Sequence, residues 1–238
     1  MVGEKMKKVL IIIPAYNEQD NIKDVITKIE KDYTQYDYVV INDCSQDKTK
    51  DILSKEKSCC LHLPVNLGIG GAVQTGYKYA MENDYDIAVQ MDGDGQHNPE
   101  YIKDIIQPIL DGEADSVIGS RFLIREGFQS SGLRRLGIKF LSSLIRIVCG
   151  VRVFDVTSGF RAVNRKCIEL FAEEYAQDYP EPEAIVVSSM KGVRIKEVPV
   201  IMNEREGGVS SINGFKTIYY MIKVSLAILI TRLTTKRG

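Results

Sequence analysis

Two aspartates one residue apart are the most informative feature of this sequence. Asp92 and Asp94 lie in the segment QMDGDGQH, residues 90–97, directly after an apolar run that ends at Met91. Two carboxylates at this spacing, with glycines that permit a tight turn, can hold a hard divalent cation and present it to a diphosphate. Gln96 can add a third oxygen ligand. An ordinary Asp-Gly turn has the same letters, so the metal interpretation depends on where the segment lies in the fold.

A glycine-rich segment, NLGIGGA at residues 66–72, opens a predicted helix that runs to Met81. Backbone amides at the start of such a helix can face a phosphate, which makes Asn66 and Gly68 candidates for binding a nucleotide. The segment is not a Walker loop, because it lacks Gly-Lys-Ser/Thr, and Val73 breaks the G-x-G-x-x-G spacing. The sequence therefore argues against the alternative of a nicotinamide-dependent oxidoreductase.

Two further loops carry polar side chains after predicted strands. The first, PAYNE at residues 14–18, offers Tyr16 as a stacking surface; the second, NDCSQD at residues 42–47, offers acceptor carboxylates. Both loops suit the base and ribose of a nucleotide. The alternative is a structural role, in which these loops cap the helices that follow; Asp47 is well placed for this.

Short apolar runs alternate with helical periodicity over the first 120 residues. Residues 9–13 form a continuous apolar run, typical of a strand that is buried on both faces. Repeated strand-helix-strand units predict a Rossmann-like α/β domain whose mostly parallel sheet is flanked by helices, and ligands of such sheets bind at the carboxyl ends of the strands. The other expected elements are strands at residues 38–41, 61–63, 87–91 and 116–118, and helices at residues 22–29, 68–81 and 98–109.

The second half of the chain is less regular and strongly basic. Residues 127–154 contain five basic and no acidic side chains, and so do residues 207–238. These two segments carry a charge of +10 and leave −11 for the rest of the chain. Residues 133–148 predict a basic amphipathic helix, and residues 193–200 a strand that Pro199 confines to a sheet edge or bends. The charge segregation predicts a surface that meets phosphates or a lipid face rather than nucleic acid.

The C-terminal segment, residues 215–233, is rich in large apolar side chains but is interrupted by two lysines and an arginine. Its longest apolar stretch is too short for the ~20 residues that a membrane span needs. We expect a catalytic domain at residues 1–213, followed at residues 214–238 by a basic amphipathic helix that docks on a membrane surface or a small membrane protein. Packing of this helix on the protein's own sheet is the alternative.

Cysteine and histidine usage excludes several kinds of site. The five cysteines show no C-x-x-C spacing, and there are only two histidines. Disulfides, a zinc site and a multi-histidine metal cage are therefore not expected. We expect the cysteines to be reduced and mostly buried.

Seven segments together make the chain resemble the family-2 glycosyltransferases of GT-A fold. Within that family the resemblance is to the polyprenyl-phosphate group, which includes dolichyl-phosphate mannose synthase. Asn42 and Cys44 stand where that group more usually has Asp and Gly, so the nucleotide preference is open. The segments, in order between residues 11 and 212, are IIIPAYNEQDNI, VINDCSQD, NLGIGGAVQTGY, QMDGDGQH, GSRF, DVTSGFRA and VPVIMNEREGGVSSI.

The resemblance implies an inverting, Mg²⁺- or Mn²⁺-dependent transferase. It would move one sugar, a hexose such as glucose or an N-acetylhexosamine, from a nucleotide diphosphate, with UDP favoured, to polyprenyl phosphate for cell-surface glycan assembly. It further implies a cytoplasmic protein, peripheral on the inner membrane face, for which a homo-oligomer is one option. The implied site comprises Pro14, Tyr16, Glu18, Asp43, Asn66, Gly68 and Asp92 for the donor; Asp92, Asp94 and Gln96 for the metal; Arg121 with Arg134 or Arg135 for the acceptor phosphate; and Asp94, Asp155 and Arg121 as catalytic residues.

The chemistry of the acceptor separates the two main alternatives. A phosphate monoester, with a second pKa near ~6, is already largely dianionic at neutral pH and needs cationic positioning rather than a strong base. Transfer to a glycan hydroxyl instead needs a carboxylate base, for which Asp155, Glu181 and Glu183 are candidates. A catalytically silent protein that recruits a membrane partner is the third alternative.

Overall fold

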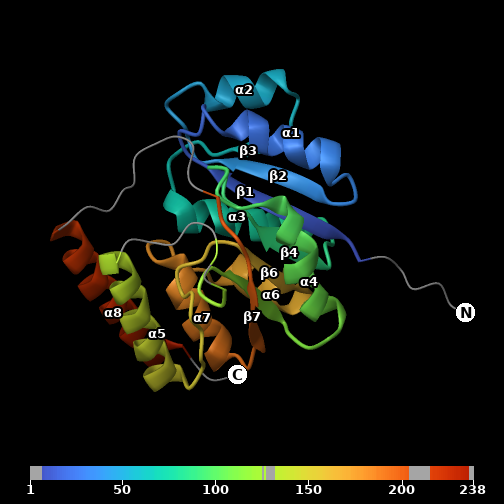
Figure 1. The fold of residues 1–238 in the computed structure, drawn as a ribbon. Helices are drawn as coiled ribbons and strands as arrows, with labels where there is room; N and C mark the ends of the chain where they lie inside the picture. Colours follow the sequence, from blue (N-terminus) through green and yellow to red (C-terminus); the bar gives the residue numbers. More distant parts are fainter. Residues whose placement is uncertain (1–6, 125, 127–131, 204–214, 236–238) are drawn as a thin grey trace, which may run out of the picture.

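The computed structural model describes residues 7–124, 126, 132–203 and 215–235, and one seven-stranded sheet forms its centre (Figure 1). The spatial order is β3-β2-β1-β4-β6-β5-β7, and only β6 runs antiparallel to its neighbours. This arrangement confirms the predicted α/β class with a mostly parallel sheet. In chain order the strands are β1 (Val9–Ala15), β2 (Asp37–Asn42), β3 (Cys60–His62), β4 (Ile87–Gln90), β5 (Ser116–Ser120), β6 (Arg161–Asn164) and β7 (Ile195–Pro199).

Helices cover both faces of the sheet. Helices α1, α2 and α4 pack on one face and α3 and α6 on the other, while α5 and α8 lie beside α7 at one end of the molecule (Figure 1). A short 3-10 turn, Pro99–Tyr101, leads into α4. The helices are α1 (Ile22–Asp32), α2 (Thr49–Lys55), α3 (Gly68–Glu82), α4 (Ile102–Leu110), α5 (Gly132–Cys149), α6 (Arg165–Glu173), α7 (Pro180–Met190) and α8 (Phe215–Thr234).

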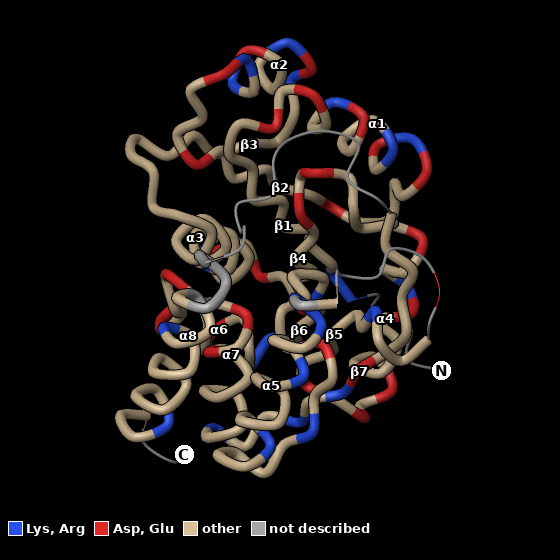
Figure 2. The backbone as a smooth tube through the Cα atoms, turned by 60° about the vertical axis from the view of Figure 1, so that its left-hand side comes forward, with Lys and Arg blue, Asp and Glu red and all other residues tan. Residues whose placement is uncertain are grey.

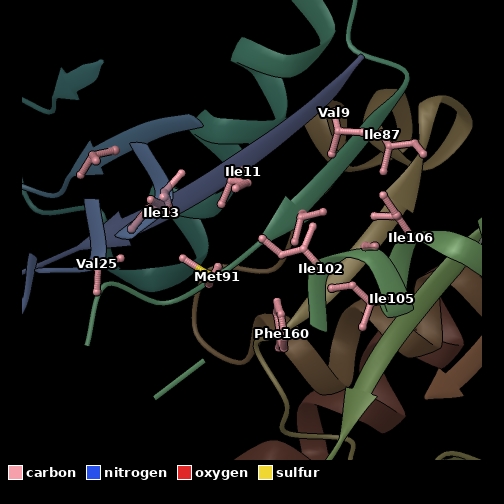
Figure 3. Close-up of a cluster of buried hydrophobic side chains, with 14 of the residues drawn as sticks. Val9, Ile11, Ile13, Val25, Ile87, Met91, Ile102, Ile105, Ile106 and Phe160 are labelled. Atoms are coloured by element: carbon pink, nitrogen blue, oxygen red, sulfur yellow. The ribbon is translucent and has the colours of Figure 1, made fainter. Parts of the chain in front are cut away.

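Strand β1 is buried along its whole length because helices cover both of its faces. Val9, Ile11 and Ile13 face α1 and α4, whereas Leu10 and Ile12 face α3. Figure 3 shows the first set together with apolar side chains of α4 and β4. Full burial of each such side chain contributes about 1.5–3 kcal/mol, so this layer anchors the central strands.

Most predicted elements are confirmed. Helix α6 was not predicted although it buries one face and has Asn164 as its N-cap, whereas two other missed elements have weak sequence signals. Residues 22–29 bury the expected helix face, and Asn98, the first residue of the helix expected at residues 98–109, accepts the Glu100 amide as an N-cap. Helix α7 was missed because it is buried on nearly all sides, so its sequence lacks an amphipathic period. Strand β6 was missed because its four residues include an arginine and an asparagine. Of the five free cysteines only Cys167 is buried, contrary to expectation.

The register of the sheet places the polar loops at one edge. Ile12 of β1 pairs with Val39 of β2 and with Gln90 of β4. Arg161, the first residue of the antiparallel strand β6, pairs with both Gln90 and Ile118. The loops that follow β1, β2, β4 and β5 and the loop that precedes β6 therefore meet at the same edge.

Helices α5 and α8 form an additional layer on α7. Ile138, Leu141 and Ile145 of α5 share a buried cluster with Val224 and Ile228 of α8. Helix α8 thus packs on α5 and α7 rather than on the sheet, and the expected domain boundary at residues 213 and 214 lies outside the described residues. Among the described residues, no helix combines the length and apolar character that a membrane crossing requires.

One carboxylate joins the last three strands of the sheet. Asp115 accepts hydrogen bonds from the Arg194 amide at 2.9 Å and from the Arg194 guanidinium at 2.9 and 3.1 Å. It also accepts the Asn164 side-chain amide at 2.9 Å. The Arg194 hydrogen bonds lower the pKa of Asp115 to about 2. A depressed pKa means that the ionised form stabilises the fold above the ordinary Asp pKa, and that this stability is lost as the pH falls toward 2.

We therefore predict that Asp115→Asn lowers the free energy of unfolding by about 2 kcal/mol at neutral pH, because hydrogen bonds to a charged group are lost. The variant should also lose part of the pH dependence of stability between pH ~4 and ~2. Urea unfolding of both proteins across this range is the measurement, with the exposed Asp104→Asn as the matched control. Equal midpoints for Asp115→Asn and the wild type at neutral pH would contradict the prediction.

Candidate active site

The loop after β4 has a backbone that only glycine accommodates easily. A Cβ atom on Gly93 would lie 3.2 Å from the carbonyl oxygen of Pro14, so the loop passes close to the end of β1. Gly95 has φ of +78°, a conformation that favours glycine. The Gln96 amide donates to Asp94 Oδ1 at 3.0 Å, which fixes the turn. The predicted metal-binding segment thus lies, as expected, at the carboxyl edge of the sheet.

His97 supports this loop and was not predicted as a site residue. Its Nδ1 accepts the Asp92 amide at 3.0 Å, and its Nε2 lies 3.7 Å from Asp92 Oδ2. The imidazole stacks on Phe160 with 4.9 Å between ring centroids. Burial lowers the pKa of His97 to about 4, so the ring is neutral at pH 7 and carries its proton on Nε2, toward Asp92. The sequence signal that could have identified His97 is its place at the end of the QMDGDGQH segment.

The carboxylates of the loop lie in an unfavourable electrostatic environment. Burial, with the Asp94 carboxylate as the second cause, raises the pKa of Asp92 to about 7, and Glu18 adds to the effect. The Asp92 side chain nevertheless remains 35% exposed, so a ligand can reach it. A bound divalent cation would offset this repulsion.

The donor set fits a hard divalent ion. Among the residues that the structure describes, no cluster of three or more His, Cys, Asp or Glu side chains could form a closed metal cage. Asp92 and Asp94 supply two carboxylates, and Gln96 is half-buried beside them. Mg²⁺ typically takes one or two carboxylates and leaves its other positions to water and phosphate oxygens, and Mn²⁺ prefers the same oxygen ligands. The residues present therefore fit either ion, and Gln96 as a ligand stays a prediction.

Gly159, which precedes β6, faces the same carboxylate. A Cβ atom at this position would lie 3.0 and 3.1 Å from the two Asp92 carboxylate oxygens and 3.2 Å from Gln90 Nε2. Such distances are tighter than nine in ten real Cβ contacts, so the carboxylate would have to shift by a few tenths of an ångström. Gly159 therefore leaves room for the Asp92 carboxylate, which sequence reasoning did not reveal.

The loop after β1 presents an exposed ring and an anchored carboxylate. Tyr16 is 47% exposed, so its ring face is available for stacking. Glu18 Oε2 accepts the Asn21 side-chain amide at 2.8 Å, and the Glu18 amide donates to Thr49 Oγ1 at 2.9 Å. Pro14 is buried at the end of β1. The structure thus brings the three predicted donor residues of this loop to the edge that carries Asp92.

Asp43 ties the loop after β2 to the start of α3. Its Oδ1 accepts the Leu67 amide at 2.7 Å, and its carbonyl oxygen accepts the Asn66 side-chain amide at 3.2 Å. Gly68 begins α3 with φ of +75°. Gly70 is required by packing, because a Cβ there would lie 2.1 Å from the carbonyl oxygen of Ala176. Helix packing thus accounts for part of the glycine-rich segment, and nucleotide contacts of Asn66 and Gly68 stay predictions.

Arg121 and Asp155 form a buried ion pair. Arg121 donates from Nε and Nη2 to the two Asp155 carboxylate oxygens, both at 2.7 Å, and from its amide to Oδ2 at 3.1 Å. Asp155 is fully buried and Arg121 is 6% exposed. Glu197 of β7 accepts the amides of Phe154 and Asp155 at 2.8 and 2.9 Å, which fixes the segment that carries Asp155. The arrangement suits Asp155 to orienting Arg121 rather than to accepting a proton from a substrate.

The two candidate arginines of α5 differ in their surroundings. Arg134 is exposed, whereas Arg135 lines a cavity of about 380 Å³ between α5 and the loop that follows it. Phe122, the neighbour of Arg121 in sequence, lines the same cavity. The basic surface of α5 therefore begins beside the Arg121–Asp155 pair.

Comparison with known proteins places this geometry in a family. The chain is 32% identical to the undecaprenyl-phosphate mannosyltransferase of Micrococcus luteus, over 87% of this chain and 88% of that protein. It is 30% identical to a UDP-N-acetylglucosamine–dolichyl-phosphate N-acetylglucosaminyltransferase of Methanococcus voltae, over 92% and 97% of the two chains.

Among solved structures, glucosyl-3-phosphoglycerate synthase of Mycobacterium tuberculosis, in complex with Mn²⁺, UDP and phosphoglyceric acid, superimposes with a TM-score of 0.71 at 21% identity. The alignment covers 96% of this chain and 79% of that one. This similarity confirms the expected GT-A fold. The model of glycosyl transferase family 2 matches residues 10–171, which is more than half of the sequence. The chain therefore belongs to glycosyl transferase family 2 and is a glycosyltransferase.

Proposed function

We propose that this protein transfers one sugar from a UDP-sugar to a polyprenyl phosphate, with Mg²⁺ or Mn²⁺ bound at Asp92 and Asp94. The observation that carries the proposal is the juxtaposition of two carboxylates and a buried, oriented arginine, Arg121, at one sheet edge, with a basic cavity beside it. The names of two relatives, which specify undecaprenyl and dolichyl phosphate, support the acceptor. The Mn²⁺ and UDP in the solved neighbour support the donor and the metal.

The donor half of the site combines the first three loops. Asp92, Asp94 and Gln96 would hold the cation, which when bound would neutralise charge on the departing diphosphate. Tyr16 offers a face for the base, and the carboxylates of Glu18 and Asp43 can accept hydrogen bonds from the nucleoside. Their hydrogen bonds within the protein hold these loops in place before the donor binds.

The acceptor half supplies positive charge in place of a base. A phosphate oxygen of the polyprenyl phosphate forms the new bond to the anomeric carbon, the bond from that carbon to the diphosphate breaks, and its electron pair leaves with UDP. In-line attack inverts the anomeric carbon. Arg121, oriented by Asp155, would position the acceptor phosphate, with Arg134 and Arg135 adding attraction. Because the phosphate is largely dianionic at pH 7, no proton has to be removed.

Membrane attachment would bring the protein to this acceptor. Exposed apolar side chains on two packed helices, with basic residues among them, are suited to lying in a lipid interface. We infer peripheral attachment through both α5 and α8, on the cytoplasmic face. The exposed apolar residues are Leu136, Phe140 and Ile147 of α5 and Tyr219, Ile222, Leu226, Leu229, Ile230 and Leu233 of α8.

Transfer to a glycan hydroxyl remains the second candidate because one carboxylate could serve as its base. Burial raises the pKa of Glu181, at the start of α7, and the nearby Asp92 carboxylate also raises it. Glu183, in contrast, accepts a hydrogen bond from Thr231 Oγ1 at 2.7 Å. Asp155 is excluded from this role by its burial against Arg121.

Replacement of Glu181 separates the two candidates. If the acceptor is a phosphate, Glu181→Gln should keep turnover within about threefold of the wild type, because no base is needed. Loss of a general base would instead cost about 10²–10⁴-fold. The assay is transfer of label from a nucleotide sugar to polyprenyl phosphate and, separately, to glycan acceptors. A loss of 100-fold or more with the lipid acceptor would contradict the phosphate mechanism.

Removing one of the paired carboxylates should abolish transfer. We predict that Asp94→Asn lowers turnover about 100-fold or more, since the metal's charge stabilisation is worth several kcal/mol. The thermal unfolding midpoint should not fall, because the substitution relieves repulsion with Asp92. Asp20→Asn, an exposed change in the loop before α1, is the control. A folded Asp94→Asn protein with undiminished turnover at saturating Mn²⁺ would refute the metal role.

Crowding the Asp92 carboxylate should weaken metal binding without removing a ligand. We predict that Gly159→Ala reduces Mn²⁺ affinity in the presence of UDP about tenfold, because the new methyl group displaces the carboxylate oxygens. Gly132→Ala is the matched control, since a Cβ there meets nothing within 4 Å. Mn²⁺ titration followed by electron paramagnetic resonance measures both. Equal affinities in the two variants would show that Asp92 does not hold the ion.

A further inference from the structure

The cavity on α5 extends beyond the residues assigned to the acceptor phosphate. It has a volume of about 380 Å³ and is bounded by α5 on one side and by the loop at residues 150–154 on the other. Three basic side chains besides Arg135 line it, and none of the described lining residues is acidic. Its lining residues are Phe122, Arg135, Lys139, Ser142, Ser143, Arg146, Arg152 and Phe154.

Three of these cations have no carboxylate partner within the part of the chain that the structure describes. The ion pairs found among the described residues include none with Lys139, Arg146 or Arg152. The guanidinium of Arg152 lies 4.6 Å from the ring centroid of Phe154, a contact that leaves its charge unneutralised. Unpaired cations that line one cavity repel each other and create a potential that attracts an anion with more than one oxygen.

Two of these cations, Lys139 and Arg146, lie on α5 together with exposed apolar side chains. Lys139, Ser142 and Arg146 follow each other at helical spacing and so lie along one side of the helix. Leu136 and Phe140, on the same helix, are 65% and 54% exposed. Figure 2 shows blue segments gathered around α5 at the lower end of the molecule. A basic cavity that borders exposed apolar side chains matches a molecule with an anionic head and apolar chains.

We propose that Lys139, Arg146 and Arg152 bind the phosphodiester headgroup of an anionic bilayer phospholipid. The acyl chains of that lipid would lie along the exposed apolar side chains of α5 and α8. The proposal rests on the membrane attachment inferred above, and it assigns this end of the cavity to a lipid other than the acceptor. It gives the attachment a defined depth, because one headgroup bound in the cavity sets the height of Arg121 above the bilayer.

Short-chain lipids below their micelle concentration test the site without a membrane surface. We expect dihexanoyl phosphatidylglycerol to bind the wild-type protein in calorimetric titrations and dihexanoyl phosphatidylcholine not to bind. Arg146→Gln/Arg152→Gln should weaken phosphatidylglycerol binding about 30-fold, since each basic side chain near an anionic lipid contributes about fivefold. Arg152 lies in an exposed loop, so the same titration can be made with Arg152→Gln alone if the double variant unfolds.

Two controls separate this site from diffuse attraction. Lys50→Gln/Lys55→Gln on α2 removes the same charge at the opposite end of the molecule (Figure 1), and Lys223→Gln removes one charge from α8. Both should bind dihexanoyl phosphatidylglycerol as the wild type does. Equal binding by the cavity variants and the wild type would overturn the proposal. Inorganic phosphate that binds as tightly as the lipid would also overturn it, because the site would then take a free anion.

A separate titration keeps this proposal distinct from the proposed function. UDP binding in the presence of Mn²⁺ reports only on the donor site. Absence of UDP binding in the wild-type protein would count against the sugar transfer and leave the lipid result standing. Normal UDP binding together with no preference for the anionic lipid would count against the lipid site alone.

Discussion

The burial of the Asp92 carboxylate beside Asp94 is the constraint on which the proposed site depends. The end of β4 is rigid because the central sheet is buried on both faces, and His97 holds the loop from within the core. Burial of Asp92, with the neighbouring Asp94 carboxylate as the second cause, raises the pKa of Asp92 to about 7. A site with this stored electrostatic cost favours a divalent cation, which removes the cost when it binds.

The rest of the molecule separates negative from positive charge around this point. The donor loops add Glu18 and Asp43 on one side, while the basic residues of α5 lie on the other. Between the two regions the Arg121–Asp155 pair is buried and fixed by Glu197 of the edge strand β7. At that point a cation lies beside the acidic edge with its orientation set by the protein. This division suits a reaction in which one phosphate leaves while another enters.

Local patterns in the sequence predicted the parts of this arrangement that depend on local physics. The spacing of Ile22, Val25, Ile26 and Ile29 predicted the buried face of α1, and the apolar run before Asp92 placed the paired carboxylates at the sheet edge. The contact between Arg121 and Asp155 joins residues 34 positions apart and has no local signature.

The same limit explains two further omissions. Antiparallel β6 and the mostly buried α7 depend on tertiary packing rather than on periodicity. Gly159 acquires its role only because the fold brings it against the Asp92 carboxylate. The residues proposed to do the chemistry were identified from the sequence, whereas the contacts that orient them were found only in the structure.

Anomalous scattering from Mn²⁺ in crystals grown with UDP tests the central claim most directly. The account predicts one strong peak about 2.2 Å from carboxylate oxygens of Asp92 and Asp94, in contact with the diphosphate. A peak bound elsewhere, or UDP bound at this edge at saturating Mn²⁺ with no ion between it and these carboxylates, would contradict it.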